Sequence, residues 1–229
     1  MTYGIIGAMD EEIAFLQSKM SHASKHEIAN SQFIEGTISN QKVVLLKSGI
    51  GKVNAAMATT ILMERFQPTA IINTGSAGGF AHNLSVGDIV ISDEVLHHDV
   101  DATAFNYTYG QVPQMPATYQ ADKVLLEKTK KIVEQLDINY EVGLVATGDS
   151  FMDDEIRINA VKKLFPNMLA AEMEGAAIAQ VCYQYDIPFI IIRALSDIAG
   201  KDSPVSFDQF LEIAAKNAAK IILSFINQE

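Results

Sequence analysis

The chain has 229 residues, and 48% of them are hydrophobic, which is enough to bury one large core. Its formal net charge of −11 at pH 7 disfavours broad contact with nucleic acid or with an anionic membrane surface. It contains three arginines, which is few for a substrate with several phosphates, because guanidinium groups are the usual clamps for phosphate.

The first part of the chain alternates short apolar runs with longer amphipathic stretches. Short apolar runs predict buried strands, and apolar residues at helical spacing predict helices that pack on a sheet. We predict a strand over Tyr3–Met9, a helix from near Asp10 to near Met20, a hairpin of Gln32–Thr37 and Lys42–Ser48, a helix over Gly51–Phe66, and strands over Ala70–Thr74 and Asp88–Val95.

The segment His97–Gln120 has no clean period and is rich in aromatic residues and proline. A loop of this length in a compact domain is typical of a lid or a subunit contact. After it the alternation returns. We predict helices over Ala121–Leu136, Asp153–Phe165, Gly175–Tyr185 and Phe207–Ile226, and strands over Glu141–Ala146, Met168–Met173 and Pro188–Leu195.

Strands that are apolar on both faces and separated by helices indicate a mixed or mainly parallel sheet with helices on both sides. No long linker or low-complexity tract interrupts the sequence, so we expect a single α/β domain over residues 1–229. In such folds the ligand sites lie just beyond the carboxyl ends of the strands.

Four strand ends carry charged or glycine-rich segments, at residues 9–12, 75–79, 172–174 and 193–197. Most of them also have a purely structural explanation. The acidic run Asp10-Glu11-Glu12 favours the positive end of a helix, and Ser196-Asp197 suits a helix or turn cap. The glycine-rich GSAGG lacks the lysine of a P-loop and the spacing of a dinucleotide-binding fingerprint, so it indicates neither a nucleotide triphosphate nor NAD.

Glu172 and Glu174 are harder to explain by structure alone. Residues two apart in a strand point to the same face, so both carboxylates are expected to converge at the end of an apolar strand. Two like charges there are costly unless a partner such as Arg193 or a ligand hydroxyl compensates them.

Cys182, the single cysteine, lies in the apolar run AAIAQVCY, which favours a buried packing role over a reactive thiol. A single cysteine forms no internal disulfide, and this fits the reducing cytosol. The N-terminal sequence becomes acidic after about eight residues, unlike a signal peptide, and no apolar run is long enough to span a bilayer. We therefore expect a cytoplasmic protein with no membrane partner.

The motifs GAMDEE, SGIGKVNAA, NTGSAGG, ATGDSF, AAEMEGAAIA and RALSDIAG follow one another along essentially the whole chain. Together they resemble the purine nucleoside phosphorylase superfamily and, within it, the bacterial 5′-methylthioadenosine/S-adenosylhomocysteine nucleosidases. AAEMEGAAIA combined with RALSD is highly specific, whereas GSAGG alone is not. The resemblance implies a three-layer α/β/α domain with a central mixed, partly barrel-like sheet. It also implies hydrolysis of the bond between adenine and a sulfur-modified ribose, without a cofactor or a metal.

The resemblance implies four catalytic roles. Glu12 in GAMDEE corresponds to the residue that activates the attacking water, and Arg193 to the residue that helps hold this carboxylate and the water. Glu174 in AEMEG corresponds to the acceptor of the sugar hydroxyls, and Asp197 in ALSD to the general acid at the purine nitrogen N7. Such a proton is needed because adenine leaves poorly as an anion, and general acid catalysis typically supplies about 100- to 10,000-fold.

The resemblance also implies the substrate contacts. Phe151 and Met152 correspond to the adenine stack and to the contacts with the base edge. The full set of expected substrate-binding residues is Met9, Ile50, Ser76, Ala77, Gly78, Phe151, Met152, Glu172, Met173, Glu174, Ser196 and Phe207.

In the family, the long loop reaches into the site of a neighbouring subunit, and Phe105 and Pro113 are the matching residues here. This implies a homodimer. Ala102 stands where the family often has a larger aliphatic residue, so the pocket for the thioalkyl group is expected to be roomier.

Two other functions stay open at this point. A phosphorylase on the same fold would use phosphate in place of water, but the acidic run at residues 10–12 would repel a dianion. A non-catalytic nucleoside-binding protein would not need Glu12, Glu174 and Asp197 together. Among substrates, methylthioadenosine, S-adenosylhomocysteine and 5′-deoxyadenosine share the adenine and ribose contacts, so the sequence does not rank them.

Overall fold

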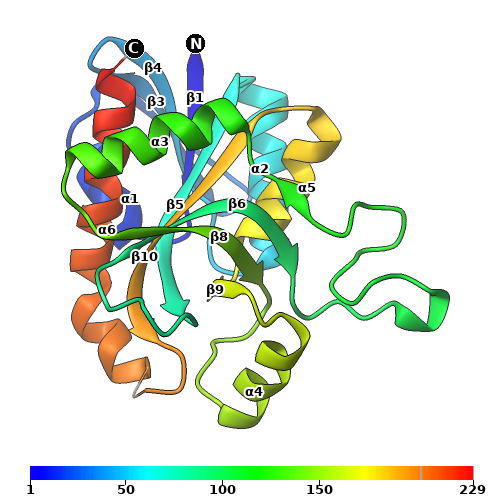
Figure 1. Cartoon of the computed structure of the whole chain (residues 1–229). Helices are drawn as coiled ribbons and strands as arrows, with labels where there is room; N and C mark the ends of the chain where they lie inside the picture. The colour runs from blue at the N-terminus through cyan, green and yellow to red at the C-terminus, as the bar shows by residue number, and fades with distance from the viewer. Residues whose placement is uncertain (202, 229) are drawn as a thin grey trace.

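The computed structural model describes the backbone of residues 1–201 and 203–228, and the side chains of these residues apart from 203–205. One sheet runs through the molecule and is covered by helices (Figure 1). Its strands are β1 (Thr2–Gly7), β2 (Ser21–Ile28), β3 (Ser31–Ile38), β4 (Gln41–Lys47), β5 (Ala70–Gly79), β6 (Ile89–His97), β7 (Tyr119–Gln120), β8 (Tyr140–Thr147), β9 (Met168–Glu172) and β10 (Phe189–Ile198). The helices are α1 (Asp10–Gln17), α2 (Lys52–Phe66), α3 (Lys123–Gln135), α4 (Glu155–Leu164), α5 (Gly175–Tyr185) and α6 (Ser203–Asn227), with a short 3₁₀ turn η1 (Thr103–Phe105).

The sheet is mixed, and part of it closes on itself. Its order is β10-β6-β8-β9-β5-β1-β4-β3-β2, and β10 also pairs with β5, so β10, β6, β8, β9 and β5 form a ring. Within the ring, β10 runs parallel to β5 but antiparallel to β6. The mixed, partly barrel-like α/β/α architecture expected from the sequence is confirmed.

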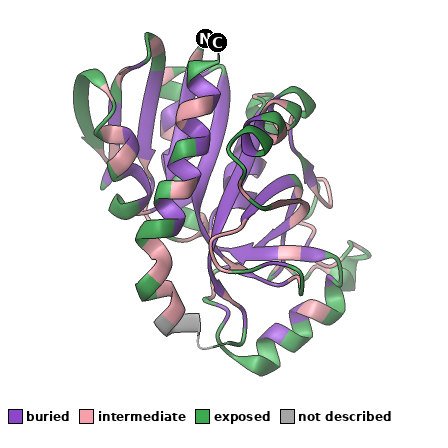
Figure 2. Ribbon diagram, turned by 60° about the vertical axis from the view of Figure 1, so that its left-hand side comes forward, coloured by how far each residue is buried: buried purple, intermediate pink, exposed green. Residues whose placement is uncertain are grey.

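Helices cover both faces of the sheet. The contacts of α6 with α1, α3 and β10 build one layer, and those of α2 with α5 build the other (Figure 1). Strand residues alternate between the two cores, as the twofold period of a strand requires. On β10, for example, Ile190 and Ile192 face the layer of α6, whereas Ile191 faces the layer of α5. In Figure 2 the central strands are coloured mostly as buried, whereas the helices also carry exposed residues.

Two strands were not predicted from the sequence: the two-residue β7, which lies inside the predicted loop, and β2. β2 has the sequence SHASKHEI, and all its residues except Ile28 are exposed. It lies at the edge of the sheet and pairs only with β3 among the described residues. Because neither face is buried, the strand shows no alternation of apolar and polar residues, and alternation is the signal from which strands are predicted.

Two strands extend further than the sequence indicates. β5 continues through GSAGG to Gly79, and β10 continues past Leu195 to Ile198, because these two ends pair with each other. The predicted loop over residues 97–120 is confirmed as largely irregular, with only η1 and β7 in it. Within the described part of the chain, no helix has the length and apolar character needed to cross a membrane.

Candidate active site

A cavity of about 250 Å³ opens where the ends of β5, β9 and β10 meet the start of α1. All four strand-end segments singled out in the sequence contribute to its wall or lie directly behind it. The lining residues are Ala8, Met9, Glu12, Ile50, Ser76, Ala77, Gly78, Ser150, Phe151, Met152, Ala171, Glu172, Met173, Glu174, Ser196, Asp197 and Phe207.

Glu12 is the one buried member of the acidic run. Asp10 and Glu11 are exposed at the first turn of α1, whereas only 2% of Glu12 is exposed. Its Oε2 accepts hydrogen bonds from the backbone N–H groups of Ala8 (2.7 Å) and Met9 (3.3 Å). The carboxylate thus reaches back to the helix N-terminus, whose positive end favours its charge.

The other oxygen of Glu12 connects it to β5. Oε1 accepts from the backbone N–H (3.0 Å) and the Oγ (3.2 Å) of Ser76. Gly75 is required beside this contact, because a Cβ there would lie 2.6 Å from Glu12 Oε1 and 2.4 Å from Arg193 Nη1. The glycine of NTGSAGG therefore lets a carboxylate and a guanidinium approach the same stretch of backbone.

Glu172 is tied to its surroundings through both oxygens. Oε1 accepts from Thr147 Oγ1, and Oε2 accepts from the backbone N–H groups of Glu174 (3.0 Å) and Gly175 (2.7 Å) and from Arg193 Nη2. It caps the start of α5 and closes β9 against that helix. Although Glu172 lines the cavity, its oxygens are engaged with protein groups, which indicates a positioning role.

Arg193 compensates the charges that converge here, and it is one of the two kinds of partner that the sequence left open. Nη2 forms an ion pair with Glu172 and lies 3.5 Å from Glu174 Oε2, and it donates to Asn73 Oδ1 at 2.7 Å. Its side chain is 1% exposed and lies behind the cavity wall. Arg193 donates hydrogen bonds to Glu172, Asn73 and Ser76, and within the described part of the chain it stands near Glu12 without a hydrogen bond to it.

Glu174 is the carboxylate that remains available to a ligand. Glu174 Oε1 accepts from the backbone N–H of Gly51 at 2.9 Å. Burial raises the pKa of Glu174 to about 7, although Arg193 and the Gly51 N–H both favour its charged form. A ligand that carries positive charge next to it would favour the ionised carboxylate.

Asp197 reaches the cavity through an irregularity in β10. The register of β10 against β5 shifts between Leu195 and Asp197, so that Asp197 stands opposite Gly78. Such a bulge re-aims side chains, and here it turns both Ser196 and Asp197 to the same cavity. Ser196 Oγ lies 2.9 Å from Asp197 Oδ1, and Asp197 is 3% exposed.

The opposite part of the cavity is aromatic. The rings of Phe151 and Phe207 meet edge to face with their centroids 5.8 Å apart. Both side chains line the cavity, with Met152 buried beside them. Flat apolar surfaces of this kind suit an aromatic ligand, whose ring can stack on one of them.

Comparisons with known proteins establish the family of the chain. The sequence model of the Phosphorylase superfamily matches residues 2–227. A 5′-methylthioadenosine/S-adenosylhomocysteine nucleosidase of Oceanobacillus iheyensis is 61% identical over 228 residues, covering 100% of both chains. The chain belongs to this nucleosidase family of the phosphorylase superfamily.

Solved structures of this nucleosidase family share the fold. The Neisseria meningitidis enzyme in complex with methylthio-immucillin-A matches with a TM-score of 0.97 and 43% identity, covering 100% of this chain and 99% of that one. The Colwellia psychrerythraea enzyme in complex with adenine matches with a TM-score of 0.96 and 49% identity, covering 100% and 95%. At 43% and 49% identity the two structures share the family of this chain as well as its fold.

The structure brings together nearly all the residues that the resemblance to nucleosidases singled out. The twelve expected substrate-binding residues line the cavity, together with Glu12 and Asp197. Arg193 lies behind it, and two residues stand elsewhere. Phe105 is 77% exposed on the protruding loop, and neither it nor Pro113 lines the cavity of its own chain.

Sequence reasoning missed three lining residues, Ala8, Ser150 and Ala171. Ala8 contributes a backbone N–H to Glu12, and a backbone donor leaves no signature in the residue type. It also missed Thr147, whose Oγ1 donates to Glu172 and accepts from the N–H of Ala176. The threonine of ATGDSF was a possible signal, because it directly precedes the loop that carries Phe151.

Proposed function

We propose that this chain hydrolyses the N-glycosidic bond of 5′-methylthioadenosine and S-adenosylhomocysteine, releasing adenine and the thioribose product. The observation that carries the proposal is that Glu12, Glu174 and Asp197 line one cavity, while none of the described lining residues is lysine, arginine or histidine. The activity belongs to methionine salvage and to the recycling of S-adenosylmethionine by-products. 5′-Deoxyadenosine offers the same adenine and ribose groups and is a further substrate.

The proposed reaction uses the three carboxyl groups in different protonation states. Asp197 gives a proton to N7 of adenine while the bond between C1′ and N9 breaks, and its electron pair stays on the base. The sugar then carries oxocarbenium character, which the nearby negative charge of Glu174 stabilises. Glu12 takes a proton from water as the water oxygen bonds to C1′. The products are neutral adenine and the free thioribose.

Arg193 and Glu172 support this chemistry from outside the reacting groups. The guanidinium of Arg193 compensates the charges of Glu172 and Glu174. Ionised Glu174 can therefore lie near the sugar beside Glu12 with a smaller loss of folding free energy. We propose that Arg193 acts on the ribose carboxylate Glu174 more directly than on Glu12.

Release of adenine with and without phosphate tests the proposed reaction. We expect equal rates in phosphate-free buffer and in phosphate, because the described residues of the cavity wall include no cationic side chain to bind a dianion. Chromatography of the sugar product should find free methylthioribose. Strict dependence on phosphate with formation of a sugar 1-phosphate would show a phosphorylase instead, and binding without any adenine release would show a nucleoside-binding protein.

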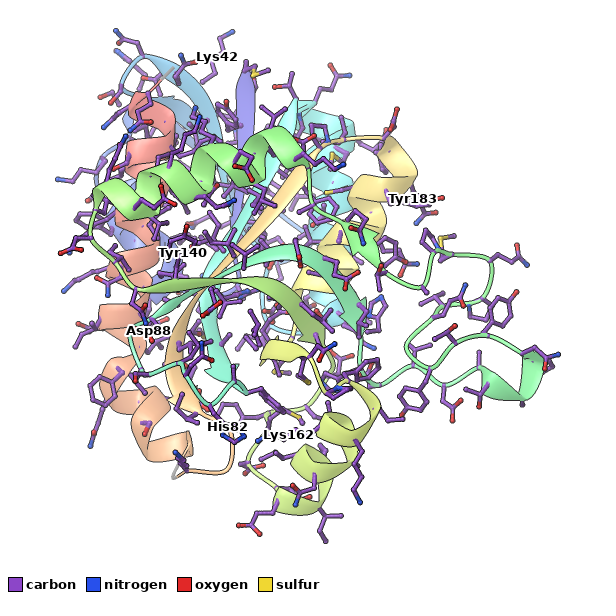
Figure 3. The ribbon with its side chains drawn as sticks, in the orientation of Figure 1. Lys42, His82, Asp88, Tyr140, Lys162 and Tyr183 are labelled. Atoms are coloured by element: carbon purple, nitrogen blue, oxygen red, sulfur yellow. The ribbon has the colours of Figure 1, made fainter. Side chains whose placement is uncertain are left out.

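We further propose that the chain acts as a homodimer in the cytosol. Figure 1 shows the segment between β6 and α3 leaving the body of the molecule, with the short helical turn η1 at its far end, and Phe105 is the last residue of η1. Val53 on α2 is 78% exposed, and Tyr183 is 54% exposed on α5 next to the base of this segment (Figure 3). Large apolar and aromatic side chains exposed in this way favour a partner. A sedimentation experiment that finds a monomer at assay concentration would contradict the proposed dimer. The unpaired, buried Cys182 suits the cytosol.

A further inference from the structure

Three segments around the cavity are joined by one carboxylate that does not touch it. Asp99 follows β6, and its Oδ1 accepts from Lys52 Nζ at 2.6 Å, at the start of α2. Its Oδ2 accepts from the backbone N–H of Asp149 at 3.0 Å. Asp149 in turn accepts from the backbone N–H of Lys52 through Oδ1 at 2.8 Å. These contacts close a loop between residues far apart in the sequence.

Each of the joined segments carries part of the site. Gly51, next to Lys52, gives its N–H to Glu174 Oε1, and Ile50 lines the cavity. Asp149 precedes the cavity-lining residues 150–152. A Cβ on Gly51 would lie 3.1 Å from Asp149 Oδ1, and Gly51 has a φ of +94°, which favours glycine. The turn is therefore held close to Asp149 by its residue type as well as by hydrogen bonds.

We name the linked residues Lys52, Asp99 and Asp149 the Asp99 bridge. We propose that this bridge has a positioning role: it holds the Gly51 N–H against Glu174, and it holds the 150–152 loop over the cavity. The inference rests on the proposed function and adds to it a set of residues that act through others. None of the three lines the cavity, so we place them behind the groups that face a ligand there.

The bridge is charged under working conditions. The bonds from Lys52 and from the Asp149 N–H outweigh burial and lower the pKa of Asp99, so this carboxylate stays ionised at neutral pH. The side chains of Lys52 and Asp99 are 21% and 29% exposed, so water screens the ion pair only in part. Neutralising either Lys52 or Asp99 should therefore weaken the Asp99 bridge.

Weakening the Asp99 bridge should change the pKa of Glu174 in one direction. The groups that face Glu174 are the Gly51 N–H, Arg193 of β10, Glu172 of β9 and Glu12 of α1. Of these, Arg193 and the Gly51 N–H favour the ionised carboxylate, and the two glutamates oppose it. Because the hydrogen bond from the Gly51 N–H lowers the pKa of Glu174, losing it should raise this pKa further. The activity requires ionised Glu174, so the acid limb of the pH profile should lie at higher pH in such a variant than in the parent protein.

The test compares Asp149→Ala with Asp149→Asn in kcat, KM and pH profile. Asparagine keeps an Oδ1 that can accept from the Lys52 N–H, whereas alanine does not. For Asp149→Ala we expect kcat/KM for methylthioadenosine to fall about tenfold, the size expected for one lost hydrogen bond. We also expect the acid limb of its profile to move to higher pH. Asp149→Asn should stay within about twofold of the parent with the parent profile.

Lys52→Met provides a second route if Asp149→Ala fails to fold. It should also lower kcat/KM and shift the acid limb, whereas Lys130→Met should change neither. Lys130 has a similar ion pair, with Glu127 on α3, at 2.8 Å and remote from the cavity.

Equal kinetics of the alanine and asparagine variants, or an unshifted acid limb in folded Lys52→Met, would overturn the positioning role. An inactive parent protein would instead overturn the proposed function, so the two failures are distinguishable.

Discussion

Replacing Asp197 by asparagine should lower kcat for methylthioadenosine by about 100-fold or more, because the amide cannot give a proton to the leaving adenine. Asparagine has nearly the same shape as aspartate and keeps an Oδ1 within reach of Ser196 Oγ. The bulge in β10 is formed by backbone pairing with β5, so it should persist. We therefore expect adenine to bind and the fold to survive. The measurements are steady-state release of adenine, calorimetric binding of adenine, and thermal unfolding.

Ser196→Ala is the matched control for this variant. It removes the hydroxyl next to Asp197 and leaves the acid in place, so the loss in kcat should be much smaller. If Asp197→Asn turned over at a near-normal rate, the proton would have to come from another group. If the folded Asp197→Asn variant failed to bind adenine, the main role of Asp197 would be to bind the base and not to protonate it.

Glu12→Gln should also lower kcat by about 100-fold or more, whereas Glu11→Gln should stay within about twofold of the parent. Glu12 is buried and engaged by α1 and β5, while Glu11 points to solvent one position away. Glutamine cannot take the proton from the attacking water. Its amide nitrogen would also face N–H donors, because both oxygens of Glu12 accept from backbone groups.

The second effect makes a stability measurement necessary for Glu12→Gln. Placing a donor against a donor in a buried site costs about 1–3 kcal/mol of unfolding free energy. The assay must therefore be run well below the melting temperature of the variant, on protein shown to be folded. Similar losses for Glu11→Gln and Glu12→Gln would contradict the choice of Glu12 as the base.

The fold and the composition of the site were largely predictable from the sequence. Alternating buried strands and amphipathic helices indicated the α/β sheet, and the chemistry at the strand ends indicated where the cavity would lie. The prediction that Glu172 and Glu174 converge was confirmed, but for a different reason. β9 ends at Glu172, so the twofold period does not reach Glu174, and the two meet because Arg193 lies between the start of α5 and β9.

The finer geometry depends on contacts that residue types do not announce. The bulge that aims Asp197 follows from the pairing of two strand ends more than a hundred residues apart. The resemblance suggested that Arg193 holds Glu12, yet in the structure the two approach across Gly75 and Arg193 bonds to Glu172. The partners of Asp99 likewise come from α2 and from the loop after β8. Such long-range pairings need coordinates.

The closed ring of strands has a consequence for how the protein is made. β10, which carries Arg193 and Asp197, fills the place between β5 and β6. Until residues 189–198 have left the ribosome, β5 and β6 lack this neighbour and expose strand edges that can pair wrongly. Synthesis proceeds at about 5–20 residues per second, so this exposed state lasts for seconds. A nascent chain halted before β10 should therefore be open to proteases and chaperones, and it should acquire protection only when this strand is inserted.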